Sequence, residues 1–126
     1  MVVGIGTDIV EIARIKKLID NYGLHFLQKV FTAREIEYCG GKAHPEVHFS
    51  GRWAVKESFY KALPGELQPE ATWKCIEILA STTSGGPKIY FTDKKFEEKC
   101  FRGGITNIHL SISHERLQCI AVVLLE

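Results

Sequence analysis

The chain has 126 residues, of which 45% are hydrophobic and 25% are charged, and its formal net charge is +1. This composition is ordinary for a soluble globular protein, and the length predicts one domain over residues 1–126 with a modest core. The small net charge argues against binding to nucleic acid or to an anionic membrane through the field of the whole molecule. A charged partner would have to be recognised by a local patch.

The cysteines and the apolar runs bear on where the protein works. The four cysteines show no CxxC or similar metal-ligand spacing. Because the N-terminus lacks the basic region and apolar stretch of a cleavable signal, we expect reduced, partly buried thiols rather than disulfides. No apolar run approaches the roughly 18 residues of a membrane span. We therefore expect a cytoplasmic protein with no membrane segment.

The first predicted element is a buried strand over residues 2–7, which is interrupted by glycines and delivers Asp8 at its end. An aspartate at a strand-to-helix junction usually serves as an N-cap, so Asp8 could cap the helix that begins near Glu11. By itself, Asp8 indicates little about function.

A helix over residues 11–23 follows, with apolar residues at helical spacing and Gly23 at its end. Its other face carries Arg14, Lys16 and Lys17. Such basic residues are by default solvated charges.

After a short helical piece, the segment TAREIEYC begins with Thr32 and Glu35 in capping-box spacing, which predicts the start of another helix. We interpret this motif as structural, and Arg34 as a surface charge. Two glycines end that helix, and Pro45 stands near the start of the next, long helix.

The long helix carries the stretch SGRWAVKESFYKAL, residues 50–63. At about 100° per residue, an apolar face forms and Glu57 and Lys61 lie together on roughly the opposite side. A Glu followed four residues later by a Lys is most often a solvated pair worth a few tenths of a kcal/mol. Arg52, placed near the helix start, could join the free amides in binding a phosphate, although an isolated arginine of this kind is usually a surface residue.

The second half of the chain predicts strands with one helix between them. A proline-containing loop leads to a strand over residues 73–81, and residues 84–91 are predicted as a turn into another strand. Thr92 is predicted to cap a short amphipathic helix over residues 93–102.

Residues 106–115 alternate strictly between apolar and polar side chains. The polar face carries His109, Ser111 and Ser113. Such a face normally meets water, but a histidine and two hydroxyls also suit a phosphate or a ribose; His114 fits a turn as well as a ligand contact. The final segment, residues 117–125, is apolar on both faces, as expected of a central strand or of one buried against another subunit.

The order of these elements excludes a regular parallel α/β fold, because strands and helices do not alternate. We expect an α+β fold, in which a small antiparallel sheet packs against the long helix that carries Glu57.

Four blocks of the sequence appear together and in order: GIGTDIVEIARI, FTAREIEYC, GRWAVKESFYKAL and HLSISHE, spanning Gly4 to Glu115. In this combination the chain resembles the holo-[acyl carrier protein] synthase family, the short 4′-phosphopantetheinyl transferases. The resemblance implies the fold of that family, assembled as a homotrimer with sites between subunits, and a role in fatty acid biosynthesis.

The reaction implied by the resemblance is attack by a serine hydroxyl of apo acyl carrier protein on the β-phosphate of coenzyme A, which releases 3′,5′-ADP. This chemistry needs charge neutralisation, in-line positioning and removal of one proton. Asp8 and Glu57 would hold Mg²⁺, which accepts a few carboxylates alongside phosphate oxygens and water. Lys61 would contact the pyrophosphate. Glu57 would act as the base, directly or through a metal-bound water.

Further contacts are also implied by the resemblance. Arg14, with Lys17 one turn away, would contact the acidic carrier protein. In a closed ring of subunits, Glu57 of one subunit could face His109 of its neighbour. The expected coenzyme A contacts are Arg52, Lys61, Gly85, Pro87, His109 and Ser111.

Two other functions remain open from the sequence. A noncatalytic module that binds coenzyme A or carrier protein would keep the fold without the chemistry, but the presence of Asp8, Glu57 and Lys61 together argues against it. A metal-dependent nucleotide pyrophosphatase would need a site that admits water as the nucleophile, and usually more carboxylates.

Overall fold

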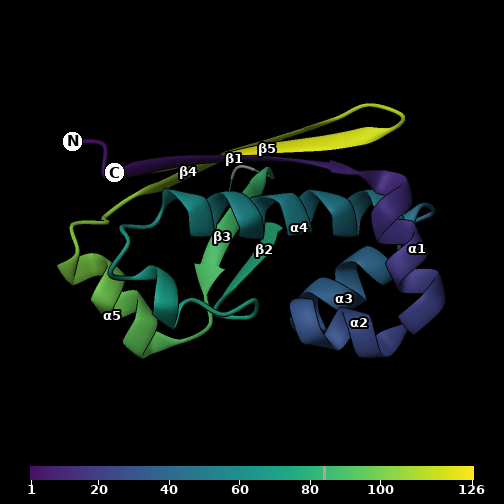
Figure 1. The fold of residues 1–126 in the computed structure, drawn as a ribbon, viewed down its shortest axis with the longest axis horizontal. Helices are drawn as coiled ribbons and strands as arrows, with labels where there is room; N and C mark the ends of the chain where they lie inside the picture. The colour runs from purple at the N-terminus through teal and green to yellow at the C-terminus, as the bar shows by residue number, and fades with distance from the viewer. Residues whose placement is uncertain (84) are drawn as a thin grey trace.

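The helix α4 (Pro45–Ala62) runs through the middle of the structure, a computed structural model that describes residues 1–83 and 85–126. A three-stranded antiparallel sheet lies along one side of α4, and the other elements lie on the opposite side (Figure 1). The strand order in this sheet is β1 (Gly4–Glu11), β5 (Gln118–Leu125), β4 (Ile108–His114).

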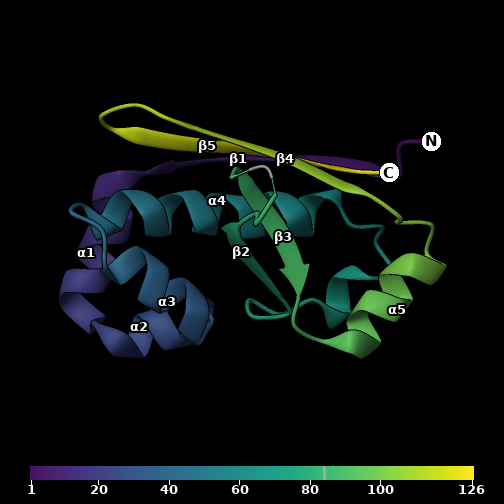
Figure 2. The same ribbon diagram turned by 180° about the vertical axis from the view of Figure 1, so that it is seen from behind.

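The elements on the other side of α4 form two groups, visible from both directions in Figures 1 and 2. Three helices gather near one end of α4, and a two-stranded hairpin with a further helix lies toward the other end. The first group is α1 (Ile12–Tyr22), α2 (Leu24–Val30) and α3 (Ala33–Gly40); the second is the short η1 turn (Gln68–Glu70), β2 (Ile76–Ala80), β3 (Pro87–Phe91) and α5 (Lys94–Arg102).

The last strand, β5, is the central strand of the larger sheet, as its two apolar faces predicted. Ala121, Val123 and Leu125 are fully buried toward α4. This arrangement confirms the α+β class and the antiparallel sheet packed on the long helix, although the strands divide into two sheets where we expected one.

The first strand packs unusually close to α4, and glycines make this possible. A Cβ atom placed on Gly4 would lie 1.9 Å from the carbonyl oxygen of Ala62, and one placed on Gly6 would lie 1.9 Å from that of Ser58. No other residue type could occupy these positions without moving the backbone of β1 away from the helix. Because side chains on a strand alternate, the next residue on this face is Asp8.

Asp8 is not the helix N-cap that the local sequence pattern left open. Strand β1 continues to Glu11, since its pairing with β5 extends to Glu11 opposite Gln118, so Asp8 lies inside the strand and not at its end. Helix α1 begins at Ile12, and Glu11 at its N-cap makes no side-chain capping bond. The side chain of Asp8 is thus left for other partners.

The other two predicted helix caps have different outcomes. The capping box of α3 is confirmed, because the Thr32 hydroxyl accepts from the Glu35 amide and the Glu35 carboxylate accepts from the Thr32 amide. The prediction of Thr92 as the cap of α5 is wrong. Asp93 occupies that position and accepts from the amides of Lys95 and Phe96, while the Thr92 hydroxyl donates to the Lys74 carbonyl.

Helix α4 is buried on more sides than its predicted apolar and polar faces indicate. Arg52 and Lys56, with 7% and 4% of their surfaces exposed, lie in the interior. Arg52 also lies well inside the helix, which begins at Pro45, so it is not next to the free amides of the N-terminus as expected. The cause is the placement of α4 between the larger sheet and the remaining elements (Figure 2).

A buried ion pair joins α3 to α4. Lys56 Nζ lies 2.9 Å from Glu35 Oε1, and the two side chains are 2% and 0% exposed. Glu35 also accepts from the Ile78 amide of β2 at 3.0 Å. Burial lowers the pKa of Lys56, and the neighbouring carboxylate of Glu35 opposes that shift. Arg34 is exposed as expected and pairs with Glu77.

The expectation of reduced cysteines is confirmed, since all four are free and buried. Burial raises the pKa of Cys39 and Cys100 to about 11, so these thiols stay protonated and unreactive at neutral pH. Within the described ranges, the helices are too short or too polar to cross a membrane.

The close packing of β1 on α4 gives the first testable prediction. Gly6→Ala should destabilise the protein by ~3 kcal/mol or more, because the added methyl group meets the Ser58 backbone and forces the two elements apart. Gly65→Ala is the matched control: its Cβ would meet nothing within 4 Å, and the change should stay within about 0.5 kcal/mol. Urea unfolding of both variants measures the difference, and equal stabilities would contradict the prediction.

Candidate active site

Three of the predicted site residues lie together where β1 crosses α4. Lys61 Nζ donates to Asp8 Oδ1 at 3.1 Å and to the Thr7 carbonyl at 3.0 Å. The side chain of Asp8 is 15% exposed and that of Lys61 is 50% exposed, so the pair lies at the surface and is open to a ligand. Asp8 and Lys61, which are 53 positions apart in the sequence, thus lie in contact at one place on the surface.

Glu57 completes this group, and its surroundings alter its acidity. Partial burial raises the pKa of Glu57, and the negative charge of Asp8 raises it further. The cations Lys61 and Arg14 act in the opposite direction. The site therefore contains two mutually repelling carboxylates with two cations close by, and Arg14 of α1 lies near enough to affect Glu57.

The donor set of this site fits Mg²⁺. Asp8 and Glu57 supply hard carboxylate oxygens, which are the protein ligands that Mg²⁺ accepts while keeping several water or phosphate oxygens. The effect of Asp8 on the pKa of Glu57 shows a repulsion between the two carboxylates that a bound cation would relieve. Two carboxylates suit an ion that needs few protein ligands. In the described part of the chain there is no group of three or more Asp, Glu, His or Cys side chains placed to hold a metal.

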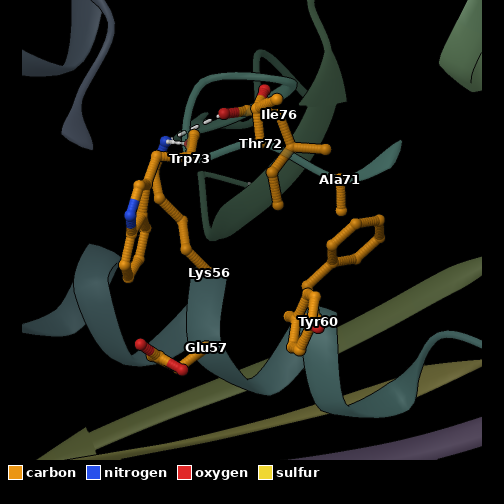
Figure 3. A pocket seen from close by; sticks show the side chains of 8 residues that line it. Lys56, Glu57, Tyr60, Ala71, Thr72, Trp73 and Ile76 are labelled. Atoms are coloured by element: carbon orange, nitrogen blue, oxygen red, sulfur yellow. Dashed lines mark hydrogen bonds between the residues drawn. The ribbon is translucent and has the colours of Figure 1, made fainter. Parts of the chain in front are cut away.

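A pocket of about 460 Å³ opens beside Glu57. Figure 3 shows Lys56, Glu57 and Tyr60 rising from α4 on one side, with Ala71, Thr72, Trp73 and Ile76 on the other. Most of these side chains are apolar or aromatic, so the pocket suits an uncharged group attached to whatever reacts at Glu57.

A second pocket, of about 240 Å³, lies beside the first half of α4. It brings together three predicted coenzyme A contacts, Arg52, Gly85 and Pro87. Ser84, the first residue of the predicted turn, lies outside the described residues. The other residues lining the pocket are Tyr38, Val47, His48, Gly51, Ala80, Ile112, His114 and Cys119.

Three basic side chains, Arg52, His48 and His114, line this second pocket. The guanidinium of Arg52 donates to the Ile78 carbonyl at 3.1 Å and lies 4.6 Å from the centre of the Tyr38 ring. Burial lowers the pKa of His48, and the nearby charges of Arg52, Lys42 and His114 lower it further. The lowered pKa favours uncharged His48, which can still form hydrogen bonds, and the permanent positive charge of Arg52 suits an anionic ligand such as a phosphate.

Sequence reasoning missed His48 and Tyr38. A signal for His48 was present, because it precedes Arg52 by four positions and so lies on the same side of the helix. Tyr38 comes from α3, and its contact with Arg52 has no counterpart in the local sequence pattern.

The structure does not bring His109 and Ser111 into either pocket. Both lie on the exposed face of β4, and His109 Nε2 is 2.9 Å from Glu126 Oε1. His114, from the end of the same strand, lines the pocket with Arg52. Arg14 and Lys17 are exposed on α1, as a partner contact requires.

The two pockets lie at different places along α4. The first is bordered by residues 56–60 of the helix and the second by residues 47–52, with no lining residue in common. Glu57 and Arg52 also point to different sides of α4, because five positions correspond to about 140° of rotation.

Sequence comparison relates the chain to one superfamily. The family model described as the 4′-phosphopantetheinyl transferase superfamily matches residues 4–118. The holo-[acyl-carrier-protein] synthase of Geotalea daltonii is 39% identical over 126 residues, which cover 100% of this chain and 99% of that relative.

Solved structures of similar proteins have the same fold over nearly the whole chain. The holo-[acyl-carrier-protein] synthase of Neisseria meningitidis has a TM-score of 0.85 and 28% identity, covering 100% of this chain and 99% of that one. That of Helicobacter pylori, in complex with coenzyme A, has a TM-score of 0.78 and 30% identity, covering 97% of this chain and 99% of that one.

The charges around Glu57 give a prediction that needs no substrate. Asp8→Asn should lower the pKa of Glu57, because a neighbouring negative charge that favours the protonated form is removed; Lys61→Met should raise it, because a stabilising cation is lost. NMR titration of the Glu57 carboxyl carbon in metal-free buffer measures both shifts. Glu98→Gln is the control, because Glu98 is an exposed residue of α5, and it should leave the pKa of Glu57 unchanged. Shifts of the same sign in the first two variants would contradict this account.

Proposed function

The chain belongs to the 4′-phosphopantetheinyl transferase superfamily, and on this premise we propose that it transfers 4′-phosphopantetheine from coenzyme A to a serine of apo acyl carrier protein, as fatty acid biosynthesis requires. The observation that carries the proposal is the meeting of Asp8, Glu57 and Lys61 beside an open pocket. These are the residues that the chemistry needs: two carboxylates and a cation for the pyrophosphate.

In the proposed reaction one bond forms and one breaks at the β-phosphorus of coenzyme A. The serine oxygen of the carrier forms a bond to the β-phosphorus of coenzyme A, and the bond from that phosphorus to the oxygen bridging to the α-phosphate breaks. Glu57 accepts the proton of the serine hydroxyl. Its raised pKa suits this task, because a base is most effective when its pKa is near the working pH. Lys61 stabilises the negative charge on the departing 3′,5′-ADP.

The proposed cofactor is Mg²⁺, held by Asp8 and Glu57. When bound, it would neutralise part of the pyrophosphate charge. Asp8 now accepts from Lys61 at 3.1 Å, and half of the Lys61 side chain is exposed. Lys61 can therefore turn toward a phosphate while Asp8 faces the ion.

We assign different parts of coenzyme A to the two pockets. The phosphates of the nucleotide suit the pocket with Arg52, His48 and His114, and the uncharged pantetheine arm suits the apolar pocket beside Glu57. The coenzyme A complex of the Helicobacter pylori relative supports this choice of ligand.

The positions of the pockets support a homotrimer with sites between subunits. Within one chain, Glu57 and Arg52 point to different sides of α4. A single ligand would therefore contact both residues more readily if Arg52 came from one copy of the chain and Glu57 from another. On the outer face of the larger sheet, β1 and β5 expose apolar side chains: Ile5, Ile9 and Ile120 are 60%, 59% and 42% exposed. Ile9 and Ile120 are direct neighbours across the strands. An exposed apolar face of this kind is typical of an interface.

The proposed docking site for the carrier protein is the exposed side of α1. Arg14 and Lys17 are both exposed there, and Arg14 lies close enough to Glu57 to influence its charge. A basic surface beside the base would attract an acidic carrier and bring its serine toward the reacting phosphate.

The transferase is tested by incubating the protein with coenzyme A and Mg²⁺, with and without apo acyl carrier protein. We expect release of 3′,5′-ADP only with the carrier, together with a carrier mass increased by phosphopantetheine, and loss of both with a chelator. Serine→Ala carrier is the matched control and should give no release. Release without carrier would indicate a pyrophosphatase, and binding without release would indicate a noncatalytic module.

A shared site is tested by mixing two inactive variants. Glu57→Gln and His114→Ala proteins, unfolded together and reassembled in equal amounts, should regain about a quarter of normal activity, because random assortment gives about a quarter of the interfaces both intact halves. The same experiment with His109→Ala in place of His114→Ala compares the two histidines. No gain over the separate variants, despite mixed assembly shown by native mass spectrometry, would place both residues in one subunit.

A further inference from the structure

Lys56 precedes Glu57 in the sequence, yet the proposed chemistry does not use it. It lies on the inner side of the pocket beside Glu57 and is almost completely buried. Its three N–H groups meet three acceptors: the Trp73 carbonyl at 2.6 Å, the Ile76 carbonyl at 2.9 Å and Glu35 Oε1 at 2.9 Å. All the hydrogen-bonding capacity of the ammonium is therefore used.

Two of these acceptors belong to the segment that forms the opposite side of the pocket. Residues 71–76 supply Ala71, Thr72, Trp73 and Ile76 to the lining, and Figure 3 shows the Lys56 side chain reaching across from α4 to this segment. Much of the segment lies between η1 and β2 and has no regular secondary structure. Backbone hydrogen bonds involve Ala71, Thr72 and Cys75, while Trp73 and Ile76 are tied to α4 by side-chain contacts.

Trp73 has a second anchor on α4. Its ring stacks on that of Trp53, with centroids 4.6 Å apart and planes inclined by 29°. Lys56 thus fixes the backbone of Trp73, while Trp53 supports its ring. Glu35 supports the other side of the ammonium and is itself fixed by the amides of Thr32 and Ile78.

A lysine is a costly choice at a buried position of this kind. Replacing a buried ion pair by apolar residues of similar volume is often neutral or stabilising, so general stability is a weak explanation for it. A hydrophobic residue, however, could not donate to two carbonyls of the irregular segment at once. The position of that segment is the property that depends on the ammonium.

We propose that Lys56, supported by Glu35, is a positioning residue that holds residues 71–76 in place as one wall of the pocket beside Glu57. This wall receives the pantetheine arm of coenzyme A. This inference rests on the function proposed above and specifies how its substrate is held. The nucleotide end of coenzyme A is assigned to the other pocket, which contains none of residues 71–76. The wall should therefore affect binding of the arm and not of the nucleotide.

The test compares the affinities of coenzyme A and of 3′,5′-ADP, which lacks the arm, by calorimetry with Mg²⁺. Lys56→Met paired with Glu35→Gln removes both charges and leaves no unpaired buried ion. Trp73→Ala removes the wall and leaves the ion pair intact. Each should weaken coenzyme A binding by roughly tenfold, with less than a twofold change for 3′,5′-ADP. Lys74→Met is the matched control on the same segment: Lys74 is exposed and outside this pocket, so both affinities should be unchanged.

A purely structural role would give a different pattern. Equal weakening of both ligands, or unchanged coenzyme A affinity in the paired variant, would overturn the proposal. If that variant does not fold, Lys56→Gln with Glu35→Gln keeps an NH2 group that can donate at position 56, and it should show the same selectivity with a smaller loss. Unmodified protein that binds coenzyme A no more tightly than 3′,5′-ADP would also overturn it. Coenzyme A binding with the expected selectivity but no carrier-dependent release would count against the transferase alone.

Discussion

The contact between β1 and α4 is the constraint on which the proposed site depends. Gly4 and Gly6 let the strand approach the carbonyls of Ala62 and Ser58 more closely than any side chain would allow. The alternation of the strand then directs Asp8 to the same face, where it meets Lys61 and the charge of Glu57. A strand held further away would leave these groups too far apart to share a cation or a phosphate. The glycines thus belong to the site although they carry no chemistry.

Helix α4 serves the site by being buried on most sides while carrying charged residues. Each buried cation has its own acceptors: Arg52 donates to the Ile78 carbonyl, and Lys56 donates to Glu35 and to two carbonyls. Among the described residues, no buried side-chain nitrogen or oxygen lacks a hydrogen-bond partner. Because its buried polar side chains have hydrogen-bond partners, α4 can carry polar and charged groups on several sides. This allows the one helix to border both pockets.

The sequence predicted the elements well, because hydrophobic periodicity and the Thr32–Glu35 motif act locally. It brought Asp8, Glu57 and Lys61 together only through a family resemblance, since no local rule says that a strand and a helix so far apart will touch. The two histidines of β4 illustrate a different limit. His114 has the same parity as Ile112, and both line the pocket of Arg52, whereas His109 lies on the opposite, exposed face of the strand. Strand alternation separates the two faces but does not say which of them meets a ligand. The ion pair of Glu35 and Lys56 depends on packing between helices and left no sequence signal.

The separation of the two pockets has a consequence for the proposed assembly. If coenzyme A extends from the Arg52 pocket of one copy to Glu57 of another, each copy contributes a nucleotide half to one site and a reacting half to a different one. The apolar row of Ile5, Ile9 and Ile120 then performs two tasks, since burying it stabilises the assembly and also sets the distance between the halves.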